Sequence, residues 1–241
     1  MLVSSENSQI PNFNPANRDN LSGVILEVLK NFSLSLENCL PAVVISHDRA
    51  KNTVIVQPAI NTILTSGNAQ ARDKIEIPVH IFGGGGIIIS TPLKEGDTGW
   101  IIACDRDIAL FKQSLIISNP NTYMTHKFSF GFFIPDKIKG FTVQNNDEDS
   151  FLIQTLDGTT RIAISEGNIK IVSSEKVEVE CVNLTATADN VIINGNTQIN
   201  GDLTVTGTIT GQTDVISGMI SGKLHTHSGV TAGNASTGAP Q

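Results

Sequence analysis

Apolar and polar residues alternate strictly through part of the C-terminal third of the chain. From Ile199 to Gly211 every odd position is apolar or glycine, and every even position is Asn, Asp or Thr. A period of two predicts a strand with one dry face and one wet face. Gly195, Gly201 and Gly207 recur every six residues on the dry face, which indicates that something crowds that face closely. The pattern predicts identical strands wound around one axis.

The same kind of pattern extends back to Phe151 as short apolar segments with regular turn signals. Beyond Cys181 the sequence contains no Phe, Trp or Tyr, and its apolar residues are small or aliphatic. A sandwich formed by one chain normally needs bulkier side chains to fill its core. A thin shaft shared by several chains does not, and such repeats cannot bury their apolar face alone. Three chains fit better than two, because a closed triangular prism leaves no open strand edge.

The N-terminal part has a different pattern. Residues 1–19 are rich in Asn, Ser and Pro, and residues 20–32 have a helical pattern with a broad apolar face. Five short β-like segments follow, which fit a small closed barrel. They are residues 42–47, 53–60, 74–81, 86–90 and 98–104. Residues 136–140 read as a linker out of this barrel.

Composition narrows the range of partners and compartments. Charged residues make up only 16% of the chain and the formal net charge is −7, so we expect no nucleic-acid partner, which would require a basic surface. Cys39, Cys104 and Cys181 have neither metal-ligand nor disulfide-framework spacing, which fits assembly in a reducing cytoplasm. We also expect no signal peptide and no membrane-spanning helix.

Two histidines near the C-terminus are the candidate metal ligands. His225 and His227 stand two residues apart, on one face of a predicted strand. In a threefold assembly they would bring six imidazole nitrogens to the axis, an octahedral set that suits iron(II) or nickel(II) better than structural zinc. The alternative is a pair of solvated histidines near a terminus. The preceding shaft favours the metal site.

Three other stretches carry weaker signals. Gly83–Gly86 lacks the Lys and the helix of a phosphate-binding loop, which favours a hairpin. Asp97 lies in a Gly-Asp-Thr-Gly turn, where its carboxylate is expected to accept backbone hydrogen bonds. Residues 104–107, Cys-Asp-Arg-Asp, could be misread as a catalytic cluster, but no hydrolase or kinase signature accompanies them. We therefore expect no enzymatic activity and assign no catalytic residue.

Several of these stretches resemble one known family, the central baseplate spike proteins of contractile-tailed bacteriophages. The resemblance rests on residues 77–86 (IPVHIFGGGG), 91–100 (TPLKEGDTGW) and 103–109 (ACDRDIA), and on the end of the chain, residues 225–230 (HTHSGV) and 237–241 (TGAPQ). It covers nearly everything after residue 37, and leaves out the N-terminal arm and helix.

The resemblance implies an all-β homotrimer with four regions. They are an N-terminal arm and short helix (1–36), an OB-fold barrel (37–135), an intertwined triple-stranded β-helix shaft (136–212) and a metal-binding tip (213–241). It also implies one iron ion, Fe²⁺, per trimer, held by six nitrogens from His225 and His227 of the three chains.

The resemblance further implies a structural role at the tip of a contractile tail. The barrel would attach the spike to the tail hub of the baseplate. The tip would cross the host outer membrane when the sheath contracts. The spike of a phage-like bacteriocin or secretion system remains an alternative, as does a tail-fibre or adaptor protein. A tail-associated lysozyme would need a positioned pair of carboxylates, which the acidic residues of the shaft do not suggest.

Overall fold

The computed structural model describes residues 20–64, 66–226, 228–229 and 233. It divides the chain into two compact units, Met1–Glu178 and Val179–Gln241, and each is considered by itself. In the part of the chain that the structure describes, no helix has both the length and the apolarity needed to span a membrane.

The first unit begins with the predicted helix. Helix α1 spans Leu21–Ser35, and Asn20 caps it by accepting a hydrogen bond of 2.7 Å from the Gly23 N–H. An asparagine at the N-cap position typically accepts such a hydrogen bond from the first turn of its helix. Gly23 is the helix's one buried residue among those described, so the helix buries almost none of its apolar surface.

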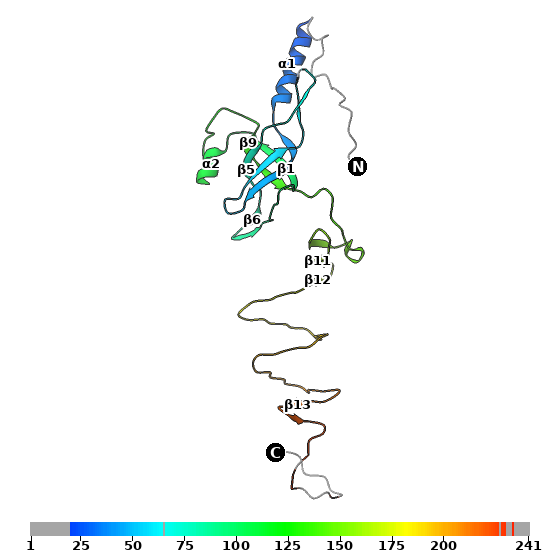
Figure 1. Ribbon diagram of the computed structural model, residues 1–241. Coiled ribbons are helices and arrows are strands. Elements are labelled where there is room, and N and C mark those ends of the chain that lie inside the picture. Colours follow the sequence, from blue (N-terminus) through cyan, green and yellow to red (C-terminus); the bar gives the residue numbers. More distant parts are fainter. Residues whose placement is uncertain (1–19, 65, 227, 230–232, 234–241) are drawn as a thin grey trace. The chain divides into compact units, whose positions relative to one another are not determined.

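A five-stranded antiparallel sheet follows, in the order β5-β2-β1-β8-β9 (Figure 1). Its strands are Cys39–Asp48 (β1), Thr53–Pro58 (β2), Ile75–Pro78 (β5), Thr98–Cys104 (β8) and Lys127–Pro135 (β9). The two edge strands approach each other: Val79, next to β5, forms a parallel bridge with Phe133 of β9, and the His80 N–H donates to the Phe133 carbonyl at 2.7 Å. The sheet is therefore a nearly closed barrel.

Strand periodicity produces the core of this barrel. Buried residues alternate along β1, β2 and β8, as the two faces of a strand require. The inward side chains form one cluster, made of Ala42, Val44, Val54, Val56, Ile77, Val79, Ile101, Phe128 and Phe133. This chain can thus fill the barrel without help from another copy.

Two glycines allow β8 and β9 to lie close together. A Cβ atom on Gly131 would lie 2.0 Å from the Ile102 carbonyl oxygen, and one on Gly99 would lie 2.3 Å from the Ile134 carbonyl oxygen. The pairing of these strands also shifts register between Ile102 and Cys104, which is the mark of a bulge. Only glycine fits at either position without moving the backbone.

The structure corrects one strand of the predicted barrel. Residues 86–90 were expected to form a barrel strand, but β7 (Ile87–Ile89) pairs only with β6 (Phe82–Gly84) in a separate hairpin. Strand β9 takes the fifth place, and the sequence analysis did not identify it. Three further short elements also lie in this region: β3 (Thr62–Ile63), β4 (Ala69–Gln70) and α2 (Ala109–Ser114).

A small second sheet lies after the barrel in the same unit. Strands β10 (Phe151–Gln154), β11 (Arg161–Ser165) and β12 (Asn168–Val172) form an antiparallel meander, preceded by the 3₁₀ turn η2 (Asn145–Asp147). Asp147 at the end of that turn is buried and accepts hydrogen bonds from Arg161 at 2.5 Å and Lys170 at 3.0 Å. The charges of this triad tie the turn to two strands.

The second unit forms very little regular structure. From Val179 to Val215 the described chain has no strand, although the sequence predicts strands at 176–181 and 199–211. Its trace reverses direction repeatedly (Figure 1), with bends at residues 189, 195, 201, 207 and 213. The six-residue spacing of the sequence is therefore present, but these segments pair with no strand among the residues that the structure describes.

The glycines at these bends have a local reason as well. Gly195 and Gly201 have φ angles of +157° and +159°, and, apart from the glycine and its two neighbours, no described atom lies within 4 Å of a Cβ built on either one. Crowding of the dry face, which the sequence analysis expected, is thus not produced within one chain. Within one chain, the positive φ angle is the reason for glycine at these two positions.

Candidate functional site

A short hairpin lies just before the predicted metal ligands. Strands β13 (Ile216–Ser217) and β14 (Ile220–Ser221) are joined by a two-residue turn. Gly218, the first residue of that turn, has a φ of +62°, which favours glycine and suits a two-residue hairpin. The hairpin is therefore an ordered element that lies directly before His225 in the chain.

Asp214 closes this hairpin. Its Oδ1 accepts hydrogen bonds from the backbone N–H groups of Val215, at 2.8 Å, and Lys223, at 3.1 Å. Hydrogen bonding from the Ser221 side chain, with these backbone donors, holds the pKa of the Asp214 carboxyl below its ordinary value. The ionised carboxylate therefore connects the two ends of the segment that leads to His225.

His225 is held from both its backbone and its ring. Its backbone N–H donates to the Ser221 carbonyl at 3.1 Å, and its Nδ1 lies 3.2 Å and 3.1 Å from the carbonyl oxygens of Ser221 and Gly222. Carbonyl oxygens only accept hydrogen bonds, so Nδ1 is the donor in both contacts, and Nε2 is the ring nitrogen that would ligate a metal. A backbone carbonyl on the second ring nitrogen is also the usual arrangement around metal-binding imidazoles.

The predicted pair of ligands is only partly described. His225 is not in a strand, since it follows the turn after β14, so a shared strand face for the two histidines is not seen. His227 lies outside the described residues. No group of three or more potential ligands occurs among the residues that the structure describes. The chemistry of His225 fits a metal that is bound through Nε2, and assignment of both histidines stays a prediction.

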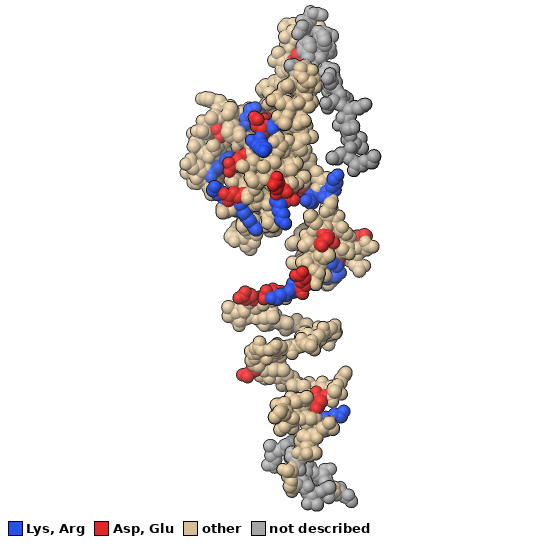
Figure 2. Space-filling view, in the orientation of Figure 1, with Lys and Arg blue, Asp and Glu red and all other residues tan. Residues whose placement is uncertain are grey.

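Many exposed apolar residues precede this tip along the second unit. They include side chains that are between 44% and 98% exposed: Val179, Val182, Leu184, Val191, Ile192, Ile193, Ile199, Leu203, Val205 and Ile209. We call these residues the shaft stripe. Residues 181–213 contain only two charged residues, Asp189 and Asp202, and this part is almost uniformly uncharged in Figure 2. One chain in water has no means of covering this stripe.

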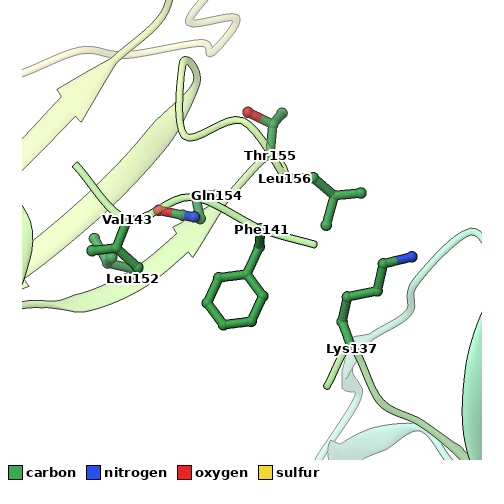
Figure 3. A pocket seen from close by; sticks show the side chains of 7 residues that line it. All are labelled: Lys137, Phe141, Val143, Leu152, Gln154, Thr155 and Leu156. Atoms are coloured by element: carbon green, nitrogen blue, oxygen red, sulfur yellow. The ribbon is translucent and has the colours of Figure 1, made fainter. Parts of the chain in front are cut away.

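A pocket of about 320 Å³ lies beside the second sheet. Figure 3 shows the Phe141 ring at its centre, with Val143 and Leu152 to one side and Lys137 to the other. The remaining lining residues are Gln154, Thr155 and Leu156. No carboxylate lines this pocket, whereas Asp97 and Asp136 both line a larger pocket of about 570 Å³.

The other candidate stretches of the sequence have structural roles. Gly85 and Gly86 join β6 to β7 in a hairpin, but this hairpin is separate from the barrel sheet, whereas a hairpin between two barrel strands was predicted. Asp97 accepts a 2.8 Å hydrogen bond from the Lys94 N–H, which confirms the turn. Asp107 is buried and accepts from the Ala109 N–H at the start of α2, and burial raises the pKa of the Cys104 thiol. A raised thiol pKa disfavours a nucleophilic role.

Asp214, whose carboxylate closes the hairpin before His225, is the residue of the candidate site that the sequence alone did not indicate. The only available signal was the repeat Ile-Ser-Gly at residues 216–218 and 220–222, which would have suggested a hairpin with a residue closing its ends. The isolated aspartate itself has no distinguishing neighbours in the sequence.

Comparison with known protein families gives two matches. Residues 40–136 match the phage protein Gp138 N-terminal domain, and residues 224–241 match the GpV apex motif. A comparison with curated proteins finds no match. The two families consist of structural phage tail proteins, and the apex motif is that of a metal-binding tip.

The order of the two matches agrees with the order of the barrel and the tip along the chain. Both matches indicate a tail spike component of a phage particle that associates with the phage tail. They confirm the resemblance found in the sequence: the chain is similar to the gpV-like baseplate spike proteins of phages.

Proposed function

We propose that the chain is a homotrimeric, non-enzymatic spike at the tip of a contractile phage tail, which pierces the host outer membrane when the sheath contracts. The observation that carries this proposal is the shaft stripe. The backbone that carries the stripe bends every six residues, and the apolar side chains of the stripe are exposed in one chain. The segment that follows matches the apex motif. Three chains wound together would bury the stripe and pair its unpaired backbone.

The barrel supports the first region of this proposal. Starting from β1, the circular strand order is β1-β2-β5-β9-β8, and the closing contact between Val79 and Phe133 is parallel. We propose that this five-stranded, partly open barrel is an OB-fold. The proposed regions remain 1–36 for the arm and helix, 37–135 for the barrel, 136–212 for the triple-stranded β-helix and 213–241 for the tip.

The proposed tip holds one iron(II) ion per trimer through His225 and His227 of each chain. Six imidazole nitrogens leave no vacant position, so such an ion would fasten three chain ends together and would not catalyse a reaction. In this chain, the Asp214-closed hairpin orients His225, and the Ser221 and Gly222 carbonyls hold its Nδ1 proton. Chain termini otherwise fray easily, so this fixation would stiffen the point.

The composition of the shaft suits passage through a membrane. An unpaired backbone amide in hydrocarbon costs several kcal/mol, and chains wound around one axis pair their backbones with each other. The low charge of residues 181–213 leaves few ionised groups to desolvate. The energy for the stroke would come from the sheath.

The proposed partners follow from this role. They are two further copies of the chain, the tail hub of the baseplate bound through the barrel, and the host outer membrane during the stroke. No nucleic-acid partner is proposed. The spike would assemble in the host cytoplasm and lie at the tip of the tail in the virion.

The metal assignment is tested by elemental analysis of the purified, untagged protein and of two variants. We expect about one iron per three chains in the wild-type protein, and loss of the iron in His225→Ala with the trimer retained. His47→Ala, which changes a histidine of strand β1, is the matched control and should keep the metal. Unchanged iron in His225→Ala would remove His225 from the ligand set.

Piercing is tested separately in a phage that encodes this protein. Deletion of residues 213–241 should leave particles that assemble and adsorb to the host but infect poorly. Full infectivity of such particles would contradict a piercing role and would favour a fibre or adaptor protein.

A further inference from the structure

Helix α1 presents a wide apolar stripe that nothing in the described chain covers. Six residues follow the i, i+3, i+4, i+7, i+8, i+11 spacing of one helical face: Leu21, Val24, Ile25, Val28, Leu29 and Phe32. Their side chains are between 45% and 76% exposed. Helices of about 12–15 residues are marginal in water without tertiary packing, and α1 has 15 residues. The helix therefore needs a partner for this face.

The stripe is chemically suited to meeting copies of itself. It carries no charged residue, while Glu27 and Lys30, the charged residues of the helix, lie on the opposite face at 100° per residue. In a symmetric assembly each residue near the axis faces its own copies, so a charge there would be repelled. The absence of charge in the stripe removes that penalty.

The heptad pattern of the stripe sets the number of helices. With Leu21 and Val28 at d positions, Ile25 and Phe32 fall at a positions. Ile or Val at a together with Leu at d is typical of two-stranded coiled coils, whereas Ile at both a and d favours three or more strands, and Val28 shares the β-branched shape of Ile. Ile25 and Val28 occupy both kinds of position in the central layers. We propose that α1 packs against α1 of two further copies, as a parallel three-helix bundle.

The connection from α1 to the barrel makes this bundle compatible with the proposed trimer, on which the inference rests. Only residues 36–38 separate α1 from β1, and they are fastened to the barrel. The Glu37 N–H donates to the His126 carbonyl at 3.1 Å, and the Ala103 N–H donates to the Asn38 carbonyl at 2.8 Å. The Glu37 carboxylate also accepts from the Phe128 N–H at 2.7 Å. Each helix is therefore joined to its own barrel by a short connection that hydrogen bonds hold in place.

Cysteine cross-linking of the full chain tests the bundle. The three native cysteines are first replaced by serine, and Ile25→Cys or Val28→Cys is introduced at an a or d position. Ser33→Cys, at a b position outside the a and d layers of the same helix, is the matched control. Disulfides form only when the Cα atoms come within about 7 Å, so mild oxidation should link chains into covalent dimers in the first two variants, and not in the control. Light scattering of each variant reports the assembly separately.

The outcomes distinguish this inference from the proposed function. A trimeric mass by light scattering, with disulfide-linked dimers in Ile25→Cys and Val28→Cys but not in Ser33→Cys, would support the bundle. Trimeric mass with no linkage at either position would overturn the bundle, leave the threefold spike intact, and direct the stripe to a different protein such as the tail hub. Equal linkage in Ser33→Cys would also overturn it. A monomeric mass in all variants, and in the wild type, would overturn the threefold assembly itself.

Discussion

The barrel buries its apolar residues within one chain, whereas the shaft leaves many of its apolar residues exposed. In the barrel, Val44, Val56 and Ile101 are fully buried within one chain. In the second unit, Ile192, Leu203 and Ile209 are each more than 60% exposed. Both regions have the alternating pattern of half-buried strands. The difference shows that alternation indicates a dry face without indicating which chain will cover it.

Residue size and backbone pairing explain why the two regions differ. The barrel contains Phe128 and Phe133, which fill the space between its own strands, and each of its strands pairs with other strands of the same chain. From Val182 to Thr213 the apolar side chains are all aliphatic and of moderate size, and bends recur every six residues from residue 189. Between Val179 and Val215 no described residue lies in a strand, so this part of the chain forms no sheet and no core of its own. One domain is complete alone, and the other is proposed to be completed by assembly.

A charge in the shaft stripe should break this contrast most strongly. Leu203→Asp would place three carboxylates near the axis of the proposed trimer, each costing about 3–5 kcal/mol if buried and unpaired. We expect a folded barrel attached to a monomeric or aggregated shaft, measured by light scattering and circular dichroism. Thr204→Asp, on the adjacent wet position, is the control and should stay trimeric. A trimeric Leu203→Asp variant would mean that Leu203 faces solvent in the assembly.

Adding a methyl group inside the barrel should have a smaller effect, on the stability of the barrel, and this effect does not depend on other chains. Gly131→Ala would drive a Cβ against the Ile102 carbonyl, and overpacking of this kind costs about 1–3 kcal/mol. Gly84→Ala is the matched control, because nothing lies within 4 Å of the added Cβ. Thermal denaturation of the two variants should show a lower barrel melting temperature for Gly131→Ala only. Equal melting temperatures would contradict the close approach of β8 and β9.

The buried triad of the second sheet should give the smallest, pH-dependent effect. Hydrogen bonds from Arg161 and then Lys170 lower the pKa of Asp147 below its ordinary value of 3.8. A lowered native pKa stabilises the folded form fully above the unfolded value, and this stabilisation is lost as the pH falls toward the native value. Hydrogen exchange of β11 and β12 should thus be faster in Asp147→Asn than in wild type at pH 7, with the difference shrinking below about pH 4.

The control for this measurement is Asp149→Asn, which changes an exposed carboxylate two residues away. Its exchange should match the wild type at both pH values. A difference between wild type and Asp147→Asn that is the same at pH 7 and pH 3 would show that the carboxylate acts through its shape and not through its charge.

Most of the barrel could be predicted from the sequence, because its local patterns agree with its fold. The helix and the strands β1, β2, β5 and β8 lie where the alternation placed them. Strand β9 was missed because Gly131 and the bulge opposite it interrupt its alternation. The run Ile87–Ile89 was assigned to the barrel because of its apolarity, but its side chains are at least 65% exposed. Only tertiary contacts decide between these two segments.

The tip and the shaft were predictable as patterns and not as contacts. The six-residue period and the two histidines are visible in the sequence, and the match to the GpV apex motif confirms the kind of protein. The role of Asp214 depends on a hairpin that brings residue 223 back to residue 214, which no local pattern reveals. The pairing of shaft strands depends on other chains, so neither the sequence pattern nor one chain's fold can supply it.

The mass of the purified full-length protein, measured by light scattering without cross-linking, tests the central claim most directly. The account predicts a single species of three times the 25.7 kDa chain mass, because the shaft stripe must be buried by two further copies. A stable, soluble monomer with the exposed stripe intact would contradict it.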